Sequence, residues 1–175
     1  MGRLKIFLTN LGEYVSGCLI GEWVKLPVPK DKLSDILTRI GIDEHNEYFI
    51  TDYETTLANL EISEYASLDE LNELAELIED LTDGDYEKLS AVLEAESPTT
   101  INGIIEIIGQ LDEFDLLAEV TTDEQIGEYY AELSCIFQGV PDHIQRYFDY
   151  EQFGRDIRLE RNCCVTSWGL VIDNR

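Results

Sequence analysis

The sequence predicts an α+β fold arranged as three small domains in succession. Short apolar or alternating runs separated by turn residues indicate strands near both ends of the chain. Between them, apolar residues recur every three or four positions behind Ser or Thr capping residues, which indicates amphipathic helices. We therefore expect an N-terminal α/β domain with antiparallel strands at residues 1–60, a helical domain at 61–110 and a C-terminal α+β domain at 111–175.

The first domain is predicted to contain an antiparallel hairpin, a helix and a third strand. Apolar or alternating runs at residues 4–9 and 18–26 are separated by an irregular loop, which predicts the hairpin. Residues 30–40 carry apolar side chains at helical spacing and end at Gly41, so a helix is expected there. Residues 47–53 predict the third strand.

The central domain is predicted to contain three helices. Ser67 followed three residues later by Glu70 is a capping-box pattern that opens the first of them. On a helical wheel its apolar residues share one arc and its acidic residues share the opposite arc. The apolar arc comprises Leu68, Leu71, Leu74, Ala75, Ile78 and Leu81, and the acidic arc comprises Asp69, Glu73, Glu76 and Asp80. The three helices are expected at residues 67–81, 86–95 and 101–108.

The last domain is predicted to combine strands with further helices. Thr122 with Gln125 forms a second capping box, so a helix begins there. This helix carries Ile126, Tyr129, Tyr130, Leu133 and Phe137 on one side and Glu124, Glu128 and Glu132 on the other. Further elements are expected as a strand at 116–120, one or two helices within 140–159, and strands within 163–173 with a turn at 167–169.

The composition indicates a folded protein whose partners are basic. Apolar residues make up 44% of the 175-residue chain, which excludes wholesale disorder. The 37 Asp and Glu residues outnumber 12 Lys and Arg and leave a formal net charge of −25. Nucleic acids and anionic membranes are polyanions that attract Lys and Arg, so we expect this chain to bind neither.

The sequence also predicts a cytoplasmic protein with free thiols. No apolar run approaches the about 18 residues that span a bilayer, and the N-terminal segment is too short and polar for a signal peptide. Disulfides are rare in the cytosol, so the cysteines are expected to be reduced. They are Cys18, Cys135, Cys163 and Cys164. Plain packing is favoured over a redox switch, and the adjacent pair is a poor disulfide candidate.

The acidic residues are concentrated in the middle of the chain. Residues 40–145 contain 28 acidic side chains and a single Lys or Arg, which is Lys88. Residues 1–39 and 146–175 are nearly neutral. The acids alternate with Leu, Ile and Tyr at helical spacing, so they belong to folded elements and do not form an acidic tail.

No motif for catalysis or for a cofactor is present in the sequence. His45 and His143 are the only histidines, and surface positions are favoured for both over metal binding or catalysis. Phosphate-binding loops, dinucleotide-binding turns and paired Cys-x-x-Cys motifs are absent. Carboxylate pairs at glycosidase spacing arise by chance among 37 acids. We therefore expect no enzymatic activity, no cofactor and no metal.

One segment approaches the spacing of an EF-hand calcium loop. Its acids at loop positions 1, 3, 5 and 12 are Asp83, Asp85, Glu87 and Glu94. Lys88 stands where the motif requires Gly, and residues 88–95 are predicted to be helical. A specific calcium site is therefore not favoured.

The acidic stripe on the helix at 67–81 suggests selection for a negative field. Like charges four residues apart destabilise a helix, and this helix contains no Lys or Arg that would relieve the repulsion. A merely solvated face is the alternative, but it accounts poorly for 28 acids against one base. At about 1.5 Å rise per residue the stripe repeats every 5 to 6 Å, so several such rows approach the charge density of duplex DNA. The hypothesis is a surface that imitates DNA.

A set of short motifs extends through nearly the whole chain, and its most specific cluster lies between residues 140 and 156. The motifs are Asn10-Leu11-Gly12 with Tyr14, Gly17, Gly21 and Trp23; Asp52-Tyr53-Glu54; Glu64-Tyr65; Glu70-Leu71-Asn72; Tyr129-Tyr130; Val140-Pro141; Tyr147-Phe148-Asp149-Tyr150; and Phe153-Gly154-Arg155-Asp156. In the order and spacing of these motifs the sequence resembles the ArdA-type antirestriction proteins, which are encoded on plasmids, conjugative transposons and phages.

The resemblance implies an elongated, curved homodimer that mimics bent DNA, occupies the DNA-binding cleft of type I restriction-modification enzymes and blocks restriction, often modification too. No residue is then catalytic. By matching position, the mimic surface includes Asp69, Glu70, Glu73, Glu76, Asp80, Asp83, Asp85 and Glu87 in the middle domain and Asp123, Glu124, Glu128 and Glu132 in the third.

Two features depart from the family pattern. Residues 133–140 lack acids where relatives often carry them, and Arg158 and Arg161 with the adjacent cysteines make a basic end. These segments are suited to a dimer contact in the C-terminal domain, where Ile136 and Phe137 are the expected apolar residues. Two alternatives to an inhibitor of restriction enzymes are considered. One is an acidic adaptor or chaperone for another basic protein, and the other is a carboxylate-based hydrolase.

Overall fold

The computed structural model describes residues 3–43 and 47–175 and has the predicted α+β fold. Within these residues it contains two three-stranded antiparallel sheets together with eight α-helices. His45 lies outside the described residues, whereas His143 is exposed. No helix of the described part is long and apolar enough to cross a membrane.

The chain divides into two compact units. One consists of Met1–Tyr86 with Pro98–Ile108, and the other of Glu87–Ser97 with Gly109–Arg175. The three domains expected from the sequence, with boundaries at residues 60 and 110, stay a prediction.

The first unit contains the sheet of order β2-β1-β3. Strand β1 (Leu4–Asn10) pairs antiparallel with β2 (Gly21–Leu26) on one side and with β3 (Tyr48–Thr55) on the other. This confirms the hairpin and the third strand. Alternate residues of β1, namely Leu4, Ile6 and Leu8, are fully buried, as the period of two along a strand requires.

Two helices of this unit differ in how well the sequence predicted them. Helix α2 (Lys30–Arg39) matches the predicted helix. The loop between β1 and β2 contains a five-residue helix, α1 (Leu11–Val15), where an irregular loop was expected. The side chain of Asn10 accepts a hydrogen bond from the backbone N–H of Glu13 and caps it. Such a short helix carries too few residues to show a periodic pattern.

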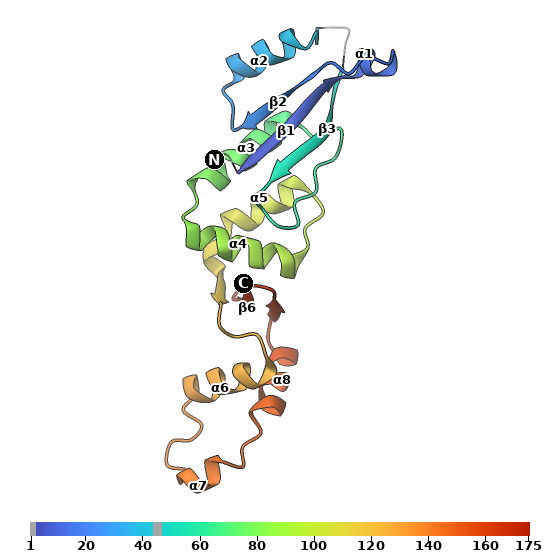
Figure 1. Cartoon of the computed structure of the whole chain (residues 1–175). Helices are drawn as coiled ribbons and strands as arrows, with labels where there is room; N and C mark the ends of the chain where they lie inside the picture. The colour runs from blue at the N-terminus through green and yellow to red at the C-terminus, as the bar shows by residue number, and fades with distance from the viewer. Residues whose placement is uncertain (1–2, 44–46) are drawn as a thin grey trace. The chain divides into compact units, whose positions relative to one another are not determined.

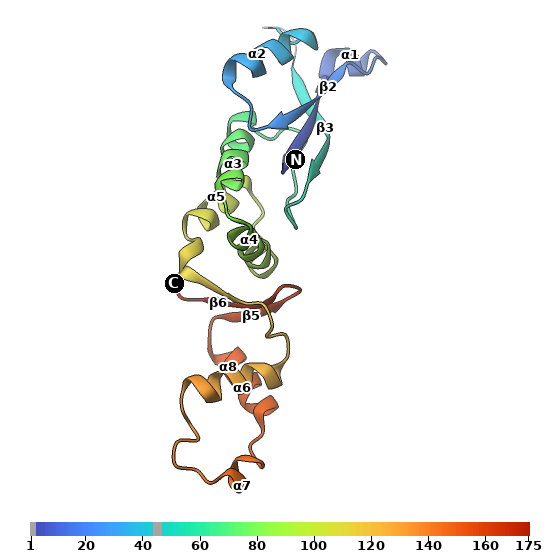
Figure 2. The same ribbon diagram turned by 60° about the vertical axis from the view of Figure 1, so that its left-hand side comes forward.

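Helices α3 (Leu68–Asp80), α4 (Asp83–Glu96) and α5 (Ile101–Gly109) follow. Helix α3 packs against β2, and Figure 2 shows it beside the sheet. The Oγ of Ser67 accepts a hydrogen bond from the N–H of Glu70, so the predicted cap is present. Helix α4 begins at Asp83, three residues before the predicted start, because Thr82 caps the segment by accepting from the N–H of Asp85.

The second unit contains the sheet of order β4-β6-β5. Strands β5 (Cys163–Thr166) and β6 (Gly169–Asp173) form the expected hairpin, with Ser167 and Trp168 in its turn. Strand β4 (Phe114–Leu117) lies about two residues before the predicted strand at 116–120. A short 3-10 turn, η1 (Leu111–Glu113), leads into it, and Phe114 is fully buried.

Helices α6 (Asp123–Leu133) and α8 (Tyr150–Glu160) cross next to this sheet. Within this unit they lie between the sheet and the short helix α7 (Asp142–Gln145), as Figure 1 shows. Ile126, Tyr130 and Leu170 form the buried core between α6 and β6. The capping box of Thr122 and Gln125 is present in both directions, as predicted.

The crossing of α6 and α8 depends on two glycines. A Cβ added at Gly127 would lie 1.9 Å from the carbonyl oxygen of Tyr150, and one added at Gly154 would lie 1.7 Å from that of Asp123. Both distances are far below any real contact, so the two backbones approach as closely as glycine alone permits. The four cysteines are free, as expected.

Candidate functional site

The acidic stripe predicted on α3 is a solvent-exposed face. Asp69, Glu73, Glu76 and Asp80 are all exposed. The opposite side of the same helix is buried at Leu68, Leu71, Leu74, Ala75 and Ile78. Leu81, predicted to share this side, is instead the extended C-cap residue after the helix and is half-buried. Burial of the apolar arc therefore fixes the rotation of α3 and keeps the acidic arc in water.

Neutral amides hold two of the carboxylates of α3 in place. The Nδ2 of Asn102 on α5 donates to Oε1 of Glu70 at 3.0 Å, and the Nδ2 of Asn72 donates to Oε1 of Glu76 at the same distance. Asn72 also accepts from the backbone N–H of Val28 at 2.7 Å, which fixes its amide. These contacts orient the carboxylates without neutralising them.

Only weak ion pairs reach α3 within the described residues. Lys30 lies 3.6 Å from Asp69, with both side chains at least 80% exposed. Lys25 lies 3.9 Å from Glu79, and both of these side chains are also exposed. Pairs of this kind contribute little in water because solvent screens them, so the face keeps most of its negative charge.

The acids at the start of α4 form no calcium loop. Residues 83–96 are one continuous helix, whereas an EF-hand needs its ligands on an open loop. The hydroxyl of Thr82 donates to Asp85 at 2.6 Å, and Arg3 lies 3.3 Å from the fully exposed carboxylate of Asp83. In residues 3–43 and 47–175, no group of three or more His, Cys, Asp or Glu side chains is arranged to hold a metal ion.

In the part of the chain that the structure describes, Lys88 donates its hydrogen bond to the main chain and not to an acidic side chain. Its Nζ donates to the carbonyl oxygen of Phe114 at 3.0 Å in a partly buried position and so ties α4 to β4. The single Lys or Arg of residues 40–145 is therefore occupied in a contact with the main chain.

Helix α6 carries a second exposed acidic row, formed by Glu124, Glu128 and Glu132. Asp123, predicted to belong to the same surface, is different. Arg158 donates to it from Nε at 2.7 Å and from Nη2 at 3.0 Å. This bidentate contact holds the pKa of the Asp123 carboxyl below its ordinary value. Asp123 therefore links α6 to α8.

The end of α6 departs from the predicted pattern. Leu133 is 63% exposed and does not join the buried side, and Phe137 lies beyond the helix. Cys135 adopts a left-handed φ of 50° and ends the helix. The N–H of Cys135 donates to the carbonyl of Glu132, and the N–H of Ile136 donates to that of Ala131. These are the two hydrogen bonds of a Schellman motif, and they turn the chain back beneath α6.

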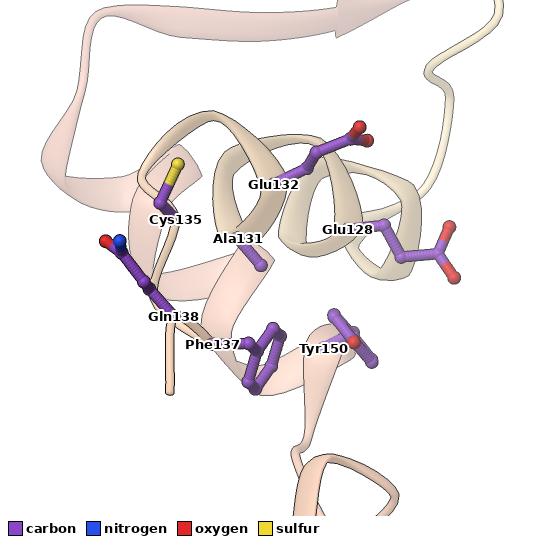
Figure 3. Close-up of a pocket in the computed structure, with 7 residues that line it drawn as sticks. All are labelled: Glu128, Ala131, Glu132, Cys135, Phe137, Gln138 and Tyr150. Carbon is purple, nitrogen blue, oxygen red and sulfur yellow. The ribbon is translucent and has the colours of Figure 1, made fainter. Parts of the chain in front are cut away.

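The turn creates a cavity of about 570 Å³ against α6. It is lined by Glu128, Ala131, Glu132, Cys135, Phe137, Gln138 and Tyr150. In Figure 3 Ala131 points toward Phe137 and Tyr150, whereas the carboxylates of Glu128 and Glu132 extend from α6 into open space. The rings of Phe137 and Tyr150 contact edge to face, with centroids 5.9 Å apart.

A second, apolar groove of about 390 Å³ shares Phe137 with the cavity. Its lining is Ile136, Phe137, Val140, Ile144, Tyr147 and Phe148. Tyr147 is 87% exposed and Ile144 is 51% exposed, although both side chains are large and apolar. Ile136 and Phe137, the residues expected at a dimer contact, therefore lie together in this groove.

Sequence reasoning found the acids but missed the groups that organise them. Asn102 carries no signal in the sequence, because its partner Glu70 lies on another helix. Asn72 was noted only as part of a family motif, and its contact with Glu76, four residues later on α3, was not predicted. Tyr150 was noted as part of a family motif, but its place in the cavity depends on the crossing of α6 and α8. The positive φ at Cys135 could not be foreseen, since Gly and Asn are the usual residues at such a position.

Comparison with known proteins agrees with the resemblance noted from the sequence. A search of curated proteins finds no match to the chain. The family model described as "Antirestriction protein (ArdA)" matches residues 6–172 and thus includes both acidic rows, the cavity and the apolar groove. The chain belongs to the ArdA family of antirestriction proteins.

Proposed function

We propose that this chain inhibits type I restriction-modification enzymes by occupying their DNA-binding cleft as a mimic of DNA. The observation that carries the proposal is the exposed row of carboxylates on α3, a helix without Lys or Arg. Membership of an antirestriction family supports inhibition as the outcome. The protein then acts by binding and needs no catalytic residue.

The spacing of the acids supports mimicry of a phosphate backbone. From Asp69 to Asp80 the exposed acids recur every three or four residues, which is about 5 to 6 Å along the helix axis. One DNA strand carries a phosphate about every 3.4 Å, so a single row is sparser than a strand. The acids at the start of α4 supply further charge, and α6 supplies a separate acidic row in the second unit.

The hydrogen bonds that neutral side chains donate to these carboxylates also support the proposal. Where the carboxylates of α3 and α4 are held by side chains, several of the donors are neutral, as with Asn72, Asn102 and Thr82. A protein that needed acids only for solubility would gain stability from Lys or Arg at neighbouring helical positions. Asp123 is excluded from the proposed surface, because Arg158 neutralises it.

We also propose that the active form is a homodimer joined through the apolar groove around Ile136 and Phe137. Large apolar side chains that remain exposed in a chain with net charge −25 are best explained by burial against another surface. The groove carries no acidic residue, so two copies can approach there with less repulsion than elsewhere.

The test is cleavage of unmodified DNA by a purified type I restriction enzyme, with this protein titrated in at low and moderate salt. The proposal expects inhibition near stoichiometric amounts that excess DNA relieves, and weaker binding to the enzyme as salt increases. Unchanged cleavage by several type I enzymes would overturn it. Specific capture of a different basic protein from a cell extract would then favour an acidic adaptor.

A further inference from the structure

We infer that the cavity beneath α6 is a socket for one arginine side chain of the protein partner. This inference rests on the proposed function, in which the partner presents the basic residues of a DNA-binding cleft. It adds a discrete recognition site to a surface that would otherwise act only through its overall charge.

The size and lining of the cavity suit a side chain that is both apolar and cationic. Its volume of about 570 Å³ lies within the range of about 300 to 1,000 Å³ typical of ligand pockets. Ala131, Phe137 and Tyr150 provide an apolar floor with two aromatic rings. Glu128 and Glu132 also line the cavity, and their exposed carboxylates extend from α6 into the solvent, as Figure 3 shows.

The lining favours a guanidinium group over an ammonium group. A guanidinium is planar and weakly hydrated, so it stacks on an aromatic ring while its N–H groups donate to carboxylates. An ammonium group is strongly hydrated and cannot stack in this way. Phe137 and Tyr150 supply rings, and Glu128 and Glu132 lie four residues apart on one face of α6 as acceptors. Among the residues that the structure describes, no Lys or Arg lines the cavity.

Charge complementarity argues against the other occupants. A second copy of this chain would bring its own excess of acids toward Glu128 and Glu132, whereas the neighbouring groove without acids is the better place for it. Anionic ligands are disfavoured for the same reason. The C-terminal end of α6, whose dipole is negative, lies at this cavity and favours a cation there.

The cavity can be tested without the partner by using N-acetyl-L-argininamide as the probe. Two-dimensional NMR spectra of the full chain are recorded while the probe is added, and N-acetyl-L-lysinamide is added in a parallel series. We expect the arginine probe to shift the amide signals of Ala131, Cys135 and Gln138, with an affinity at least about threefold greater than that of the lysine probe.

Two charge-matched variants show whether the cavity is responsible. E128Q/E132Q removes the two carboxylates at the cavity, whereas E113Q/E119Q removes two exposed carboxylates of the same unit that do not line it. We expect the first variant to weaken binding of the arginine probe at least about fivefold and the second to leave it unchanged. All four glutamates are exposed, so both variants retain the fold, and their spectra verify this.

Three outcomes would overturn the inference. The probe could shift amides along α3 and α6 alike, it could bind both variants equally, or the cavity amides could respond only to protein concentration, which would place a second copy there. The cleavage assay distinguishes failure of this inference from failure of the proposed function. Inhibition of the restriction enzyme without probe binding would contradict the arginine-binding cavity alone, whereas probe binding without inhibition would contradict the proposed function alone.

Discussion

Arg158 on α8 holds Asp123 at the first turn of α6 through two parallel hydrogen bonds, of 2.7 Å and 3.0 Å. Both side chains are only partly exposed, at 34% and 24%. Asp123 thus helps to hold two helices together. The acidic surface predicted from charge alone therefore includes one carboxylate whose charge is neutralised by an ion pair with Arg158.

Replacing Asp123 with Asn is expected to destabilise the second unit in a pH-dependent manner. Arg158 lowers the pKa of the folded carboxyl below the ordinary value of 3.8, so the stabilisation is present at neutral pH and is lost as pH falls through the folded pKa. Urea unfolding of D123N at pH 7 should show a loss of about 1 to 2 kcal/mol. A loss of the same size at pH 3 would contradict the ion pair as its cause.

The crossing at Gly127 and Gly154 is expected to tolerate no side chain. G154A places a Cβ against the carbonyl of Asp123, so α6 and α8 must separate, at a cost of about 3 kcal/mol. G109A is the matched control, because Gly109 lies in the same unit and nothing lies within 4 Å of a Cβ there. The chain has two tryptophans, Trp23 and Trp168. In a W23F background the remaining Trp168 lies in the second unit, so its fluorescence reports unfolding of that unit alone. Equal midpoints for the two glycine variants would contradict the close approach.

Reversing the exposed row of α3 is expected to weaken inhibition of a type I restriction enzyme. D69K/E73K/E76K/D80K should raise the half-inhibitory concentration at least about tenfold, because many weak charge contacts are lost together. The single change E73Q should alter it less than about twofold, since no one contact dominates. The cleavage assay measures both.

The matched control for this face carries the same charge reversal elsewhere in the first unit. D31K/D35K/E61K/E64K changes four exposed acids that lie outside the predicted surface. It should inhibit nearly as well as the unchanged protein. If both quadruple variants lose the same potency, total charge and not the face on α3 determines binding.

Introducing a charge into the apolar groove is expected to separate the proposed dimer. I136E would place a carboxylate among Phe137, Val140 and Tyr147, where burial against a second copy leaves it without a partner. Sedimentation velocity should then show a monomer. L19E, at a side chain that is 66% exposed in the first unit, should remain dimeric. A monomeric unchanged protein would contradict the homodimer itself.

Much of the fold could be predicted because its signals are local. Thr122 and Gln125 lie within one helical turn, and the apolar residues of α3 recur every three or four positions. The capping box was found correctly, and so was the apolar arc apart from Leu81. The shifted start of β4 and the exposure of Leu133 depend on contacts between distant segments, which periodicity does not record.

Contacts between segments that are distant in the sequence also limit prediction of the acidic surface. Acidic residues on a solvent face can be counted from the sequence, and the exposure of Glu73 and Glu128 agrees with that count. Whether a carboxylate remains charged toward solvent depends on its partner. Asp123 has Arg158, which is 35 residues away in the sequence, so its neutralisation could not be foreseen.

The neutral partners of the carboxylates have a consequence for binding entropy. An exposed glutamate normally samples many rotamers, and fixing each one on association opposes binding. Glu70 and Glu76 are already restrained by the amides of Asn102 and Asn72, and Asp85 by the hydroxyl of Thr82. These side chains are therefore partly ordered before any partner arrives, yet they retain their full charge.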